Sequence, residues 1–569
     1  MTAVPPGPHH PRFLQVQAEI LDRAPEHTPQ PSLERVRSVL EVLGDPQRSY
    51  PVVHVTGTNG KTSTARMIDR LLREHGLRTG RFTSPHLSHV GERITVDGLR
   101  LDDERFVAAW DDVAPYVQLV DERSQAEGGP RLSFFEVLTV MAFAVFADAP
   151  VDVAVVEVGL GGLWDSTNVA DAAVAVVTPV ALDHERWLGH GLAAIAEQKS
   201  GIVKEGSVLV TAEQPLEVAE VLMRRSVATG SVVAREGIEF GVLSRDVAVG
   251  GQRLTLKGLV GGAEDVYLPL HGAHQARNAA VAAAAVEAFL GSGGHAGTGL
   301  DADLVRDAFA HVDSPGRLEA VRRGPLVVVD AAHNPAGAAA AADGLREAFP
   351  GTRLVGVVGV MADKDAEAIL TELEPVLTEV VVTAPRTPRA MPASELADVA
   401  LGVFGEGRVH ERPDLADAVD TALAAAETGT SGDDVAVGVV VTGSIYLVAE
   451  ARTLLGAQAP DSLAVDTTSR GVSAVAEDTA RRVLGEDAEG LDDELDELAR
   501  LGVRDDLHDE RDERPVAADP YAPPEDSALL DDPWLVREEH DDYWDDDTDT
   551  DAADEGDGDG SDGGAGPRA

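Results

Sequence analysis

The chain has 569 residues, enough for several domains at roughly 100–200 residues each, and its 44% hydrophobic content allows sizeable cores. It contains no cysteine, which excludes disulfides, thiolate metal sites and a cysteine nucleophile. The net charge of −52, more than half of it in residues 458–569, argues against nucleic-acid binding, because phosphate contacts need clustered Lys and Arg.

The N-terminal segment does not have the pattern of a signal peptide. It lacks a basic region followed by an apolar core, so we predict no signal peptide. No apolar run in the chain reaches the roughly 18 residues that a membrane span needs, and we therefore expect a cytoplasmic location. Residues 1–32 are rich in Pro and His and are expected to be only partly ordered, whereas residues 33–43 have helical spacing.

A glycine-rich turn between a strand and a helix predicts a phosphate site. Residues 52–56 are apolar, residues 57–62 read GTNGKT, and residues 64–75 have helical spacing. In such a turn glycines let the backbone approach the phosphates, and the helix N-terminus supplies N–H groups and partial positive charge. Lys61 would reach the β/γ-phosphates, and the Thr62 hydroxyl would face a Mg²⁺-bound nucleotide. The alternative is a βα turn with chance glycines; Lys-Thr at the first helical turn favours nucleotide binding.

Beyond this turn, short apolar runs alternate with helical patterns, which indicates a parallel sheet flanked by helices. The expected elements up to residue 312 are strands 151–158, 173–178 and 208–211, a loop 121–131, helices 134–146, 192–196, 273–290 and 304–310, and a β-rich stretch 231–270. We therefore expect residues 1–312 to form one α/β domain.

The sequence Asp313-Ser-Pro-Gly316 cannot continue a helix and predicts a domain boundary. The alternation then resumes, with strands expected at 326–331, 354–360, 379–384 and 435–442. A second, smaller α/β domain is expected over residues 313–457.

Residues 458–569 are expected to form an acidic, mostly disordered tail. Residues 476–501 have the spacing of an amphipathic helix, and residues 531–564 are dominated by Asp and Gly, which repel one another and build no core. Two uses remain open: a solubilising tail, or a segment that docks a partner through Trp534, Tyr543 and Trp544.

Further polar residues stand where a parallel sheet binds ligands, beyond the carboxyl ends of its strands. Ser84 and His86 lie in a loop after the first βα unit, where a plain surface loop is the alternative. Glu157 ends an apolar strand and is a natural Mg²⁺ ligand beside a phosphate loop. His184 could join the same metal shell. Lys199 could be carbamylated by CO₂ and bridge metals, although a surface lysine at a helix end is the simpler alternative.

The order of motifs resembles the folylpolyglutamate synthase/dihydrofolate synthase branch of the Mur-ligase superfamily, from about residue 15 to 456. The motifs are GTNGKTS from Gly57, SPHL from Ser84 with ERI from Glu92, SFFEVLT from Ser133, EVGLGG from Glu157, DSTN from Asp165, LDH from Leu182, QKSGIVK from Gln198, HGAHQARN from His271, PGRLE from Pro315, DAAHNP from Asp330, DKD from Asp363 and TGS from Thr442. Each motif is modest alone, but in this order they are highly specific.

This resemblance implies a Mur-ligase-like α/β fold: a central P-loop-type parallel-sheet ATPase domain and a smaller C-terminal Rossmann-like domain. The acidic tail, expected to be disordered, has no counterpart in the family. It implies a monomeric ligase in which ATP phosphorylates a folate or dihydropteroate carboxylate and the amine of L-glutamate attacks the acyl phosphate. Mg²⁺ and a monovalent cation are the implied ions. Nucleic acid and membrane are not expected partners, and an unknown partner for the tail stays open.

The resemblance also implies roles for individual residues. Lys61, Lys199 and His184 are the expected catalytic residues. ATP contacts are expected from Gly57, Thr58, Asn59, Gly60, Lys61, Thr62, Asn278, Arg317, Asp330 and His333. Metal contacts are expected from Ser84, Glu157, His184 and carbamylated Lys199. Substrate contacts are expected from Ser84, Pro85, His86, Phe134, Phe135, Glu136 and Ser444.

The implied ATP site spans the domain boundary, since Arg317 and His333 follow it and Lys61 precedes it, so closure of the domains would complete the site. The chain departs from the family pattern at Leu163-Trp164, at Ser166 and at Gln198, the last of which removes a carboxylate beside the metals. Two alternatives stay open: a ligase acting on UDP-muramyl substrates, which the SPHL/ERI stretch disfavours, and a non-catalytic ATP-binding scaffold that presents the tail.

Overall fold

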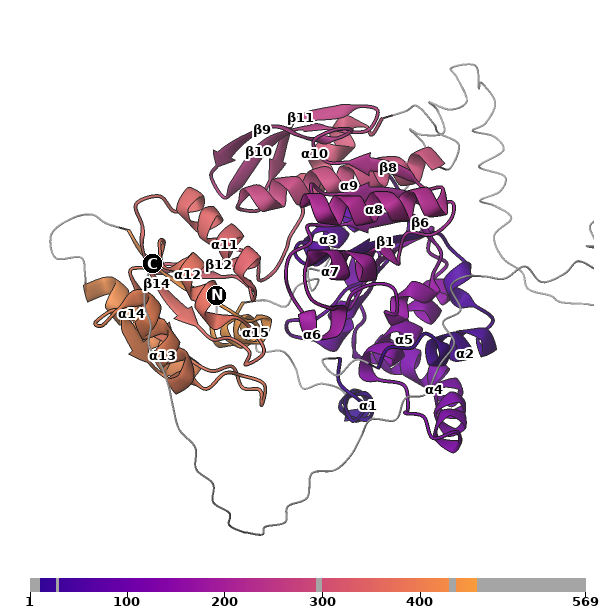
Figure 1. The fold of residues 1–569 in the computed structure, drawn as a ribbon, viewed down its shortest axis with the longest axis horizontal. Coiled ribbons are helices and arrows are strands. Elements are labelled where there is room, and N and C mark those ends of the chain that lie inside the picture. Colours follow the sequence, from indigo (N-terminus) through magenta and orange to yellow (C-terminus); the bar gives the residue numbers. More distant parts are fainter. Residues whose placement is uncertain (1–10, 27–29, 293–298, 429–435, 458–569) are drawn as a thin grey trace, which may run out of the picture. The chain divides into compact units, whose positions relative to one another are not determined.

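The computed structural model describes residues 11–26, 30–292, 299–428 and 436–457 (Figure 1). The amphipathic helix predicted over 476–501 and the acidic tail lie outside these ranges.

An eight-stranded sheet forms the centre of the first part of the chain, in the order β4-β3-β2-β5-β1-β6-β7-β8. Six neighbouring strands of the sheet, β2, β5, β1, β6, β7 and β8, run parallel to one another. At the edge beside β2, β3 pairs antiparallel with β2 and β4 pairs antiparallel with β3. The strands are β1 Val52–Thr56, β2 Thr79–Phe82, β3 Ile94–Val96, β4 Leu99–Arg100, β5 Val153–Glu157, β6 Ala172–Val177, β7 Val208–Thr211 and β8 Val232–Arg235. Because β1 lies between β5 and β6, the loops that follow these three strands meet at one edge of the sheet.

Helices cover both faces of this sheet, which explains why β1 is apolar on both sides: Val53 and Val55 pack into one core and Val52 into the other. The helices are α1 Pro11–Leu21, α2 Glu34–Val42, α3 Lys61–Glu74, α4 Asp103–Ala126, α5 Phe134–Asp148, α6 Glu185–Leu188, α7 Leu192–Ser200, α8 Leu216–Thr229, α9 Ala273–Ser292 and α10 Ala302–Ala310. The cores place α3, α9 and α10 on one face, and α1, α2, α4, α5, α7 and α8 on the other.

A three-stranded antiparallel sheet packs against α9 and α10 (Figure 1) and confirms the β-rich stretch predicted from the sequence. It consists of β9 Gly241–Ala248, β10 Gly251–Lys257 and β11 Gly262–Leu268. The carboxylate of Glu287, on α9, closes the β10–β11 turn by accepting hydrogen bonds from the backbone N–H groups of Leu259, Val260 (3.1 Å) and Gly261 (3.2 Å). Glu287 is only 5% exposed, so α9 and the small sheet are joined by a buried charged group.

Replacing Glu287 by alanine is expected to loosen this junction. The variant leaves three backbone donors without their acceptor, and a hydrogen bond to a charged group is worth about 1.5–3 kcal/mol. We expect a loss of at least about 2 kcal/mol in the local free energy of opening, measured as faster amide hydrogen exchange at residues 259–261. Glu287→Gln keeps one acceptor oxygen, so its exchange rate at these residues should lie between those of the wild type and Glu287→Ala. Unchanged exchange in the alanine variant would show that the turn holds without the carboxylate.

The C-terminal part of unit Met1–Asp466 contains a six-stranded sheet in the order β12-β13-β17-β14-β15-β16, parallel except for β12. Its strands are β12 Glu319–Arg323, β13 Leu326–Val329, β14 Arg353–Val358, β15 Glu379–Val382, β16 Val409–Glu411 and β17 Val437–Thr442. Its helices are α11 Pro335–Ala348, α12 Ala366–Leu373, α13 Ala393–Phe404, α14 Leu415–Thr428 and α15 Ile445–Leu454. Both faces are covered, with α11, α12 and α13 on one side and α14 and α15 on the other.

Residues 11–21, within the segment expected to be only partly ordered, form α1, which buries Phe13, Val16 and Ile20. One sequence prediction was wrong. The loop predicted over 121–131 begins as helix, since α4 runs to Ala126. The polar residues of this stretch led to the prediction of an exposed loop. Asp121, however, is buried in an ion pair with Arg23 (2.9 Å) instead of facing solvent.

Candidate active site

The turn after β1 has the conformation that a phosphate loop requires. Gly57 has φ +144°, and a Cβ there would lie 1.9 Å from Thr178 Oγ1. Gly60 has φ +88°, and a Cβ there would lie 2.7 Å from Asn278 Oδ1. Both positions therefore need glycine for conformation and for space. Lys61 is the first residue of α3, so its side chain and the N-terminus of the helix face the same space.

Two lysines converge on this turn from different helices. Lys61 Nζ donates to the carbonyl oxygens of Gly57 (3.1 Å) and Thr58 (3.2 Å), and Lys199 Nζ donates to the same Gly57 oxygen (2.7 Å). Burial lowers the pKa of both amines; for Lys199 the fall is large, and the charge of Lys61 adds to it. Among the residues that the structure describes, no carboxylate forms an ion pair with either Nζ, and two amines held together in this way suit an anionic ligand.

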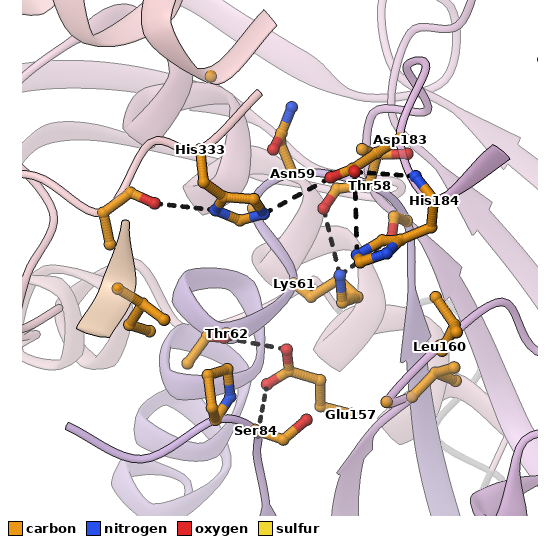
Figure 2. A pocket seen from close by; sticks show the side chains of 18 of the residues that line it. Thr58, Asn59, Lys61, Thr62, Ser84, Glu157, Leu160, Asp183, His184 and His333 are labelled. Atoms are coloured by element: carbon orange, nitrogen blue, oxygen red, sulfur yellow. Dashed lines mark hydrogen bonds and ion pairs between the residues drawn. The ribbon is translucent and has the colours of Figure 1, made fainter. Parts of the chain in front are cut away.

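Glu157, the last residue of β5, lies beside Lys61 and is 1% exposed. Its carboxylate accepts hydrogen bonds from Thr62 Oγ1 (2.9 Å) and from the backbone N–H of Ser84 (3.3 Å), as Figure 2 shows. Burial raises its pKa to about 7, although the charge of Lys61 opposes the rise. A buried carboxylate and a hydroxyl at a phosphate loop are the donors with which proteins hold Mg²⁺, so the residues fit that ion.

His184 lies above Lys61 in the view of Figure 2, in the loop after β6. It has φ +54°, and burial lowers its pKa to about 4, so its imidazole is neutral at pH 7 and able to ligate a metal. In the described ranges no three His, Asp or Glu side chains cluster around a metal-sized space. The predicted set of Ser84, Glu157, His184 and Lys199 contains only two such residues and stays a prediction.

The C-terminal sheet supplies the opposite side of the site. Asp330 follows β13, and its two carboxylate oxygens accept the backbone N–H groups of Leu318 and Ala332 (both 2.9 Å). It therefore shapes the loop that carries His333. Arg317 stands next to the glycine at the domain boundary, and its guanidinium contacts the Gly316 carbonyl at 3.4 Å.

Most of the predicted site residues line one cavity of about 520 Å³. These are Gly57, Thr58, Asn59, Gly60, Lys61, Thr62, Ser84, Pro85, Phe135, Glu136, Glu157, His184, Lys199, Asn278, Arg317, Asp330, His333 and Ser444. Ser84 and Pro85 lie near Glu157, and Ser444 caps α15 through its hydroxyl, on the C-terminal side.

Two residues predicted to contact substrate face elsewhere. His86 Nδ1 accepts a hydrogen bond from Arg93 Nε (2.9 Å), and the Arg93 guanidinium lies over the Phe134 ring at 5.1 Å. Both His86 and Phe134 line a separate, smaller void. Glu136 reaches the cavity but is engaged, since it closes the capping box of α5 and pairs with Arg35 at 2.9 Å. The helix register that turns Phe135 into the cavity turns Phe134 away from it.

Sequence reasoning missed two side chains that matter for the geometry. Lys364, in the DKD motif, lines the cavity and pairs with Asp183. The motif was visible, and Lys364 is one of five lysines in the chain, but nothing in its local pattern indicates a partner 181 residues away. Trp164, noted in the sequence only as a departure from the family pattern, also lines the cavity.

Comparison with known proteins shows which family the chain resembles. Residues 316–445 match the family described as "Mur ligase, glutamate ligase domain". The dihydrofolate synthase/folylpolyglutamate synthase of Mycobacterium tuberculosis is 50% identical over 459 residues, which cover 78% of this chain and 94% of that protein.

A helix able to cross a membrane is absent from the ranges that the structure describes.

Solved structures agree as well. M. tuberculosis folylpolyglutamate synthase, complexed with ADP and AMPPCP, has a TM-score of 0.75 and 49% identity, covering 79% of this chain and 99% of that one. A folylpolyglutamate synthase complexed with AMPPCP and folate has a TM-score of 0.66 and 31% identity, covering 78% of this chain and 99% of that one. The chain therefore belongs to the folylpolyglutamate synthase/dihydrofolate synthase family of Mur ligases.

Proposed function

We propose that the chain is an ATP-dependent ligase that joins L-glutamate to a carboxylate of a folate-type acceptor. The observation that carries this proposal is a single cavity that holds a phosphate loop, the buried Glu157–Thr62 pair and residues of the C-terminal sheet. The relatives named above supply the acceptor class, since one is crystallised with an ATP analogue and folate. Tetrahydrofolate polyglutamylation is the first activity, and conversion of dihydropteroate to dihydrofolate is the second.

The reaction needs two anions to meet. A carboxylate oxygen of the acceptor attacks the γ-phosphorus of ATP, and the bond to the ADP oxygen breaks. The amine nitrogen of glutamate then attacks the carbon of the acyl phosphate, loses a proton, and phosphate leaves. Lys61, at the N-terminus of α3, is placed to stabilise the negative charge on the transferring phosphoryl group. Neutralising charge in this way is the main catalytic task of the protein.

The donors for Mg²⁺ in this proposal are Ser84, Glu157 and His184, and a carbamylated Lys199 helps to hold a second ion. The Thr62 hydroxyl lies beside Glu157. Mg²⁺ bound there would neutralise phosphate charge during transfer. The low pKa of Lys199 supports carbamylation, because only a neutral amine attacks CO₂. A monovalent cation stays a prediction without a side chain that argues for it.

Phe135 is the aromatic residue that carries acceptor recognition in this proposal. It lines the cavity and packs against Phe82, with the ring centroids 5.6 Å apart, so its own position is fixed. An aromatic face of this kind stacks on a pterin ring. Ser444, on the C-terminal side, is the proposed contact for incoming glutamate. The carboxylate to be activated would then lie between Phe135 and Lys61.

The test is ATP consumption coupled to incorporation of labelled glutamate, with tetrahydrofolate, dihydropteroate and a UDP-muramyl acceptor compared side by side. We expect turnover with the first two and none with the third. Turnover only with the UDP-muramyl acceptor would establish the alternative ligase, and ATP binding without consumption would establish a scaffold. The catalytic part is proposed to act as a cytoplasmic monomer, with the tail serving a separate partner. A chain ending at residue 457 should then keep its turnover.

Lys199→Ala is expected to lower kcat about 10- to 100-fold, because it removes the proposed ligand of the second metal ion. If the ligand is a carbamate, a small carboxylic acid such as acetate can occupy the vacated space and supply the missing oxygens. Acetate should therefore restore part of the activity of Lys199→Ala, with no effect on the wild type or on Lys199→Arg. Full activity of Lys199→Ala, or no rescue over a wide acetate range, would contradict the carbamate.

A further inference from the structure

One carboxylate collects hydrogen-bond donors from the far side of the cavity. Asp183 follows β6, and its Oδ2 accepts a hydrogen bond from Asn334 Nδ2 (3.0 Å) and lies 3.5 Å from His333 Nε2. Its Oδ1 contacts Lys364 Nζ and accepts the backbone N–H of His184 (2.8 Å). The contacts of Asp183 with His333 and His184 appear in Figure 2.

The side-chain donors come from two loops of the C-terminal sheet, whereas Asp183 lies in the loop that follows β6 of the first sheet. His333 and Asn334 lie between β13 and α11, and Lys364 lies between β14 and α12. Asn334 also exchanges two hydrogen bonds with Asn59 of the phosphate loop, at 3.0 and 3.1 Å. The phosphate loop and Asp183 are thus tied to the same short stretch of the C-terminal sheet.

Among the groups that contact Asp183, the Lys364 ammonium depends most on this carboxylate for a fixed position. A lysine side chain has high rotamer freedom, so holding it in one place has an entropic cost. Lys364 is only 8% exposed, it lines the cavity, and its charge and that of Lys61 both act on His184. An ion pair with a buried carboxylate keeps such a cation in one position, where a mobile ammonium would serve the reaction poorly.

Asp183 also acts on the phosphate loop from within the first sheet. Its negative charge opposes the fall in pKa that burial imposes on Lys61 and Lys199. One carboxylate therefore influences three lysines of the cavity, two through space and Lys364 by direct contact.

We propose that Asp183 is a positioning residue of the ligase reaction, which holds Lys364 and His333 against the phosphate loop so that these cationic and hydrogen-bonding groups are in place when the two anionic reactants meet. The inference rests on the proposed function. Asp183 is not itself a catalytic residue, since it acts through the groups that it holds.

The first test is kinetic. Asp183→Asn keeps the size of the side chain and an oxygen for Asn334 but loses the charge that holds Lys364. We expect kcat for glutamate addition to fall about a hundredfold, while KM for ATP stays within about threefold. Combining it with Lys364→Met should reduce kcat little below Lys364→Met alone, because both changes remove one interaction. The matched control is Asp171→Asn, an aspartate 3.5 Å from Lys204 and 74% exposed, which should leave kcat unchanged. A wild-type kcat in Asp183→Asn, or multiplicative losses in the double variant, would overturn the proposal.

The second test needs neither ATP nor folate, so it separates this inference from the proposed function. Brief labelling with acetic anhydride, followed by peptide mass spectrometry, compares the reactivity of Lys364 with that of the exposed Lys257 in the same molecule. The ratio is expected to rise severalfold in Asp183→Asn, because Lys364 is released. An unchanged ratio would show that Asp183 does not keep Lys364 in position, even if the protein ligates glutamate. If the ratio rises but the wild type ligates no glutamate, Asp183 does position Lys364 and the proposed ligase reaction is wrong.

Discussion

Lys61→Met is expected to lower kcat for glutamate addition by about 10²- to 10³-fold, the typical cost of removing one group that stabilises transition-state charge. Lys61 begins α3 and bonds to the carbonyls of Gly57 and Thr58, so its ammonium stands where the β/γ-phosphates of ATP would lie. Methionine preserves the length of the side chain but supplies no charge. The loss should appear in the first chemical step, measured as ADP formed in one turnover with folate present and glutamate omitted.

The matched control is Lys257→Met, since Lys257 also donates to a backbone carbonyl, that of Ile238 at 2.9 Å, but lies on β10 of the small sheet. Its kcat should equal that of the wild type. Lys61→Arg should remain impaired, because a planar guanidinium does not replace a compact ammonium in a turn closed by Gly57 and Gly60. Normal single-turnover ADP formation in Lys61→Met would show that the phosphoryl group is stabilised elsewhere.

The phosphate side of the site was predictable from the sequence because its information is local. A strand, a turn that needs glycine and a helix opening with Lys61 are contiguous, and the structure has β1 and α3 as expected. Glu157 and His184 follow two further apolar strands. In a parallel sheet the ends of neighbouring strands meet, so these residues were expected near Lys61 and line the same cavity.

The acceptor side was less predictable, because it depends on helix rotation. The sequence SFFE from Ser133 predicts the start of a helix. It does not predict the rotation of that helix, which packing sets so that Phe135 faces the cavity and Phe134 lies under Arg93. The contact of Asp183 with Lys364 was beyond reach for another reason. It joins two sheets through residues 181 positions apart, and no periodicity or turn chemistry encodes such a pair.

The buried charged groups of the site are expected to destabilise the protein when no ligand is bound. Burial lowers the pKa of Lys61 and Lys199 and raises that of Glu157, so the charged form of each is penalised where it stands. These penalties disappear only when phosphate and a divalent cation supply opposite charge. Residues kept for catalysis should therefore cost the ligand-free protein stability, and Glu157 gives the clearest measurement.

Glu157→Gln is expected to stabilise the metal-free protein while it abolishes activity. The pKa of Glu157 rises from 4.5 to about 7 in the folded state, mainly through burial. Between pH 4.5 and 7 the folded state therefore binds more protons than the unfolded state, and the free energy of unfolding falls as pH rises. The cost at pH 8 is at most about 3 kcal/mol, and glutamine removes it. The amide can keep both contacts, with its oxygen accepting the Ser84 N–H and its NH2 group donating to the Thr62 hydroxyl.

The measurement is urea unfolding of both proteins in EDTA at pH 5 and pH 8. Glu157→Gln should exceed the wild type by about 2–3 kcal/mol at pH 8 but by less than about 1 kcal/mol at pH 5, so the comparison of the two pH values is the control. With Mg²⁺ present, kcat of Glu157→Gln should fall at least about a hundredfold, because an amide is a poor ligand for a hard cation. If the variant is less stable than the wild type at pH 8, Glu157 is a structural carboxylate held by Thr62 and Ser84 rather than a ligand awaiting its metal.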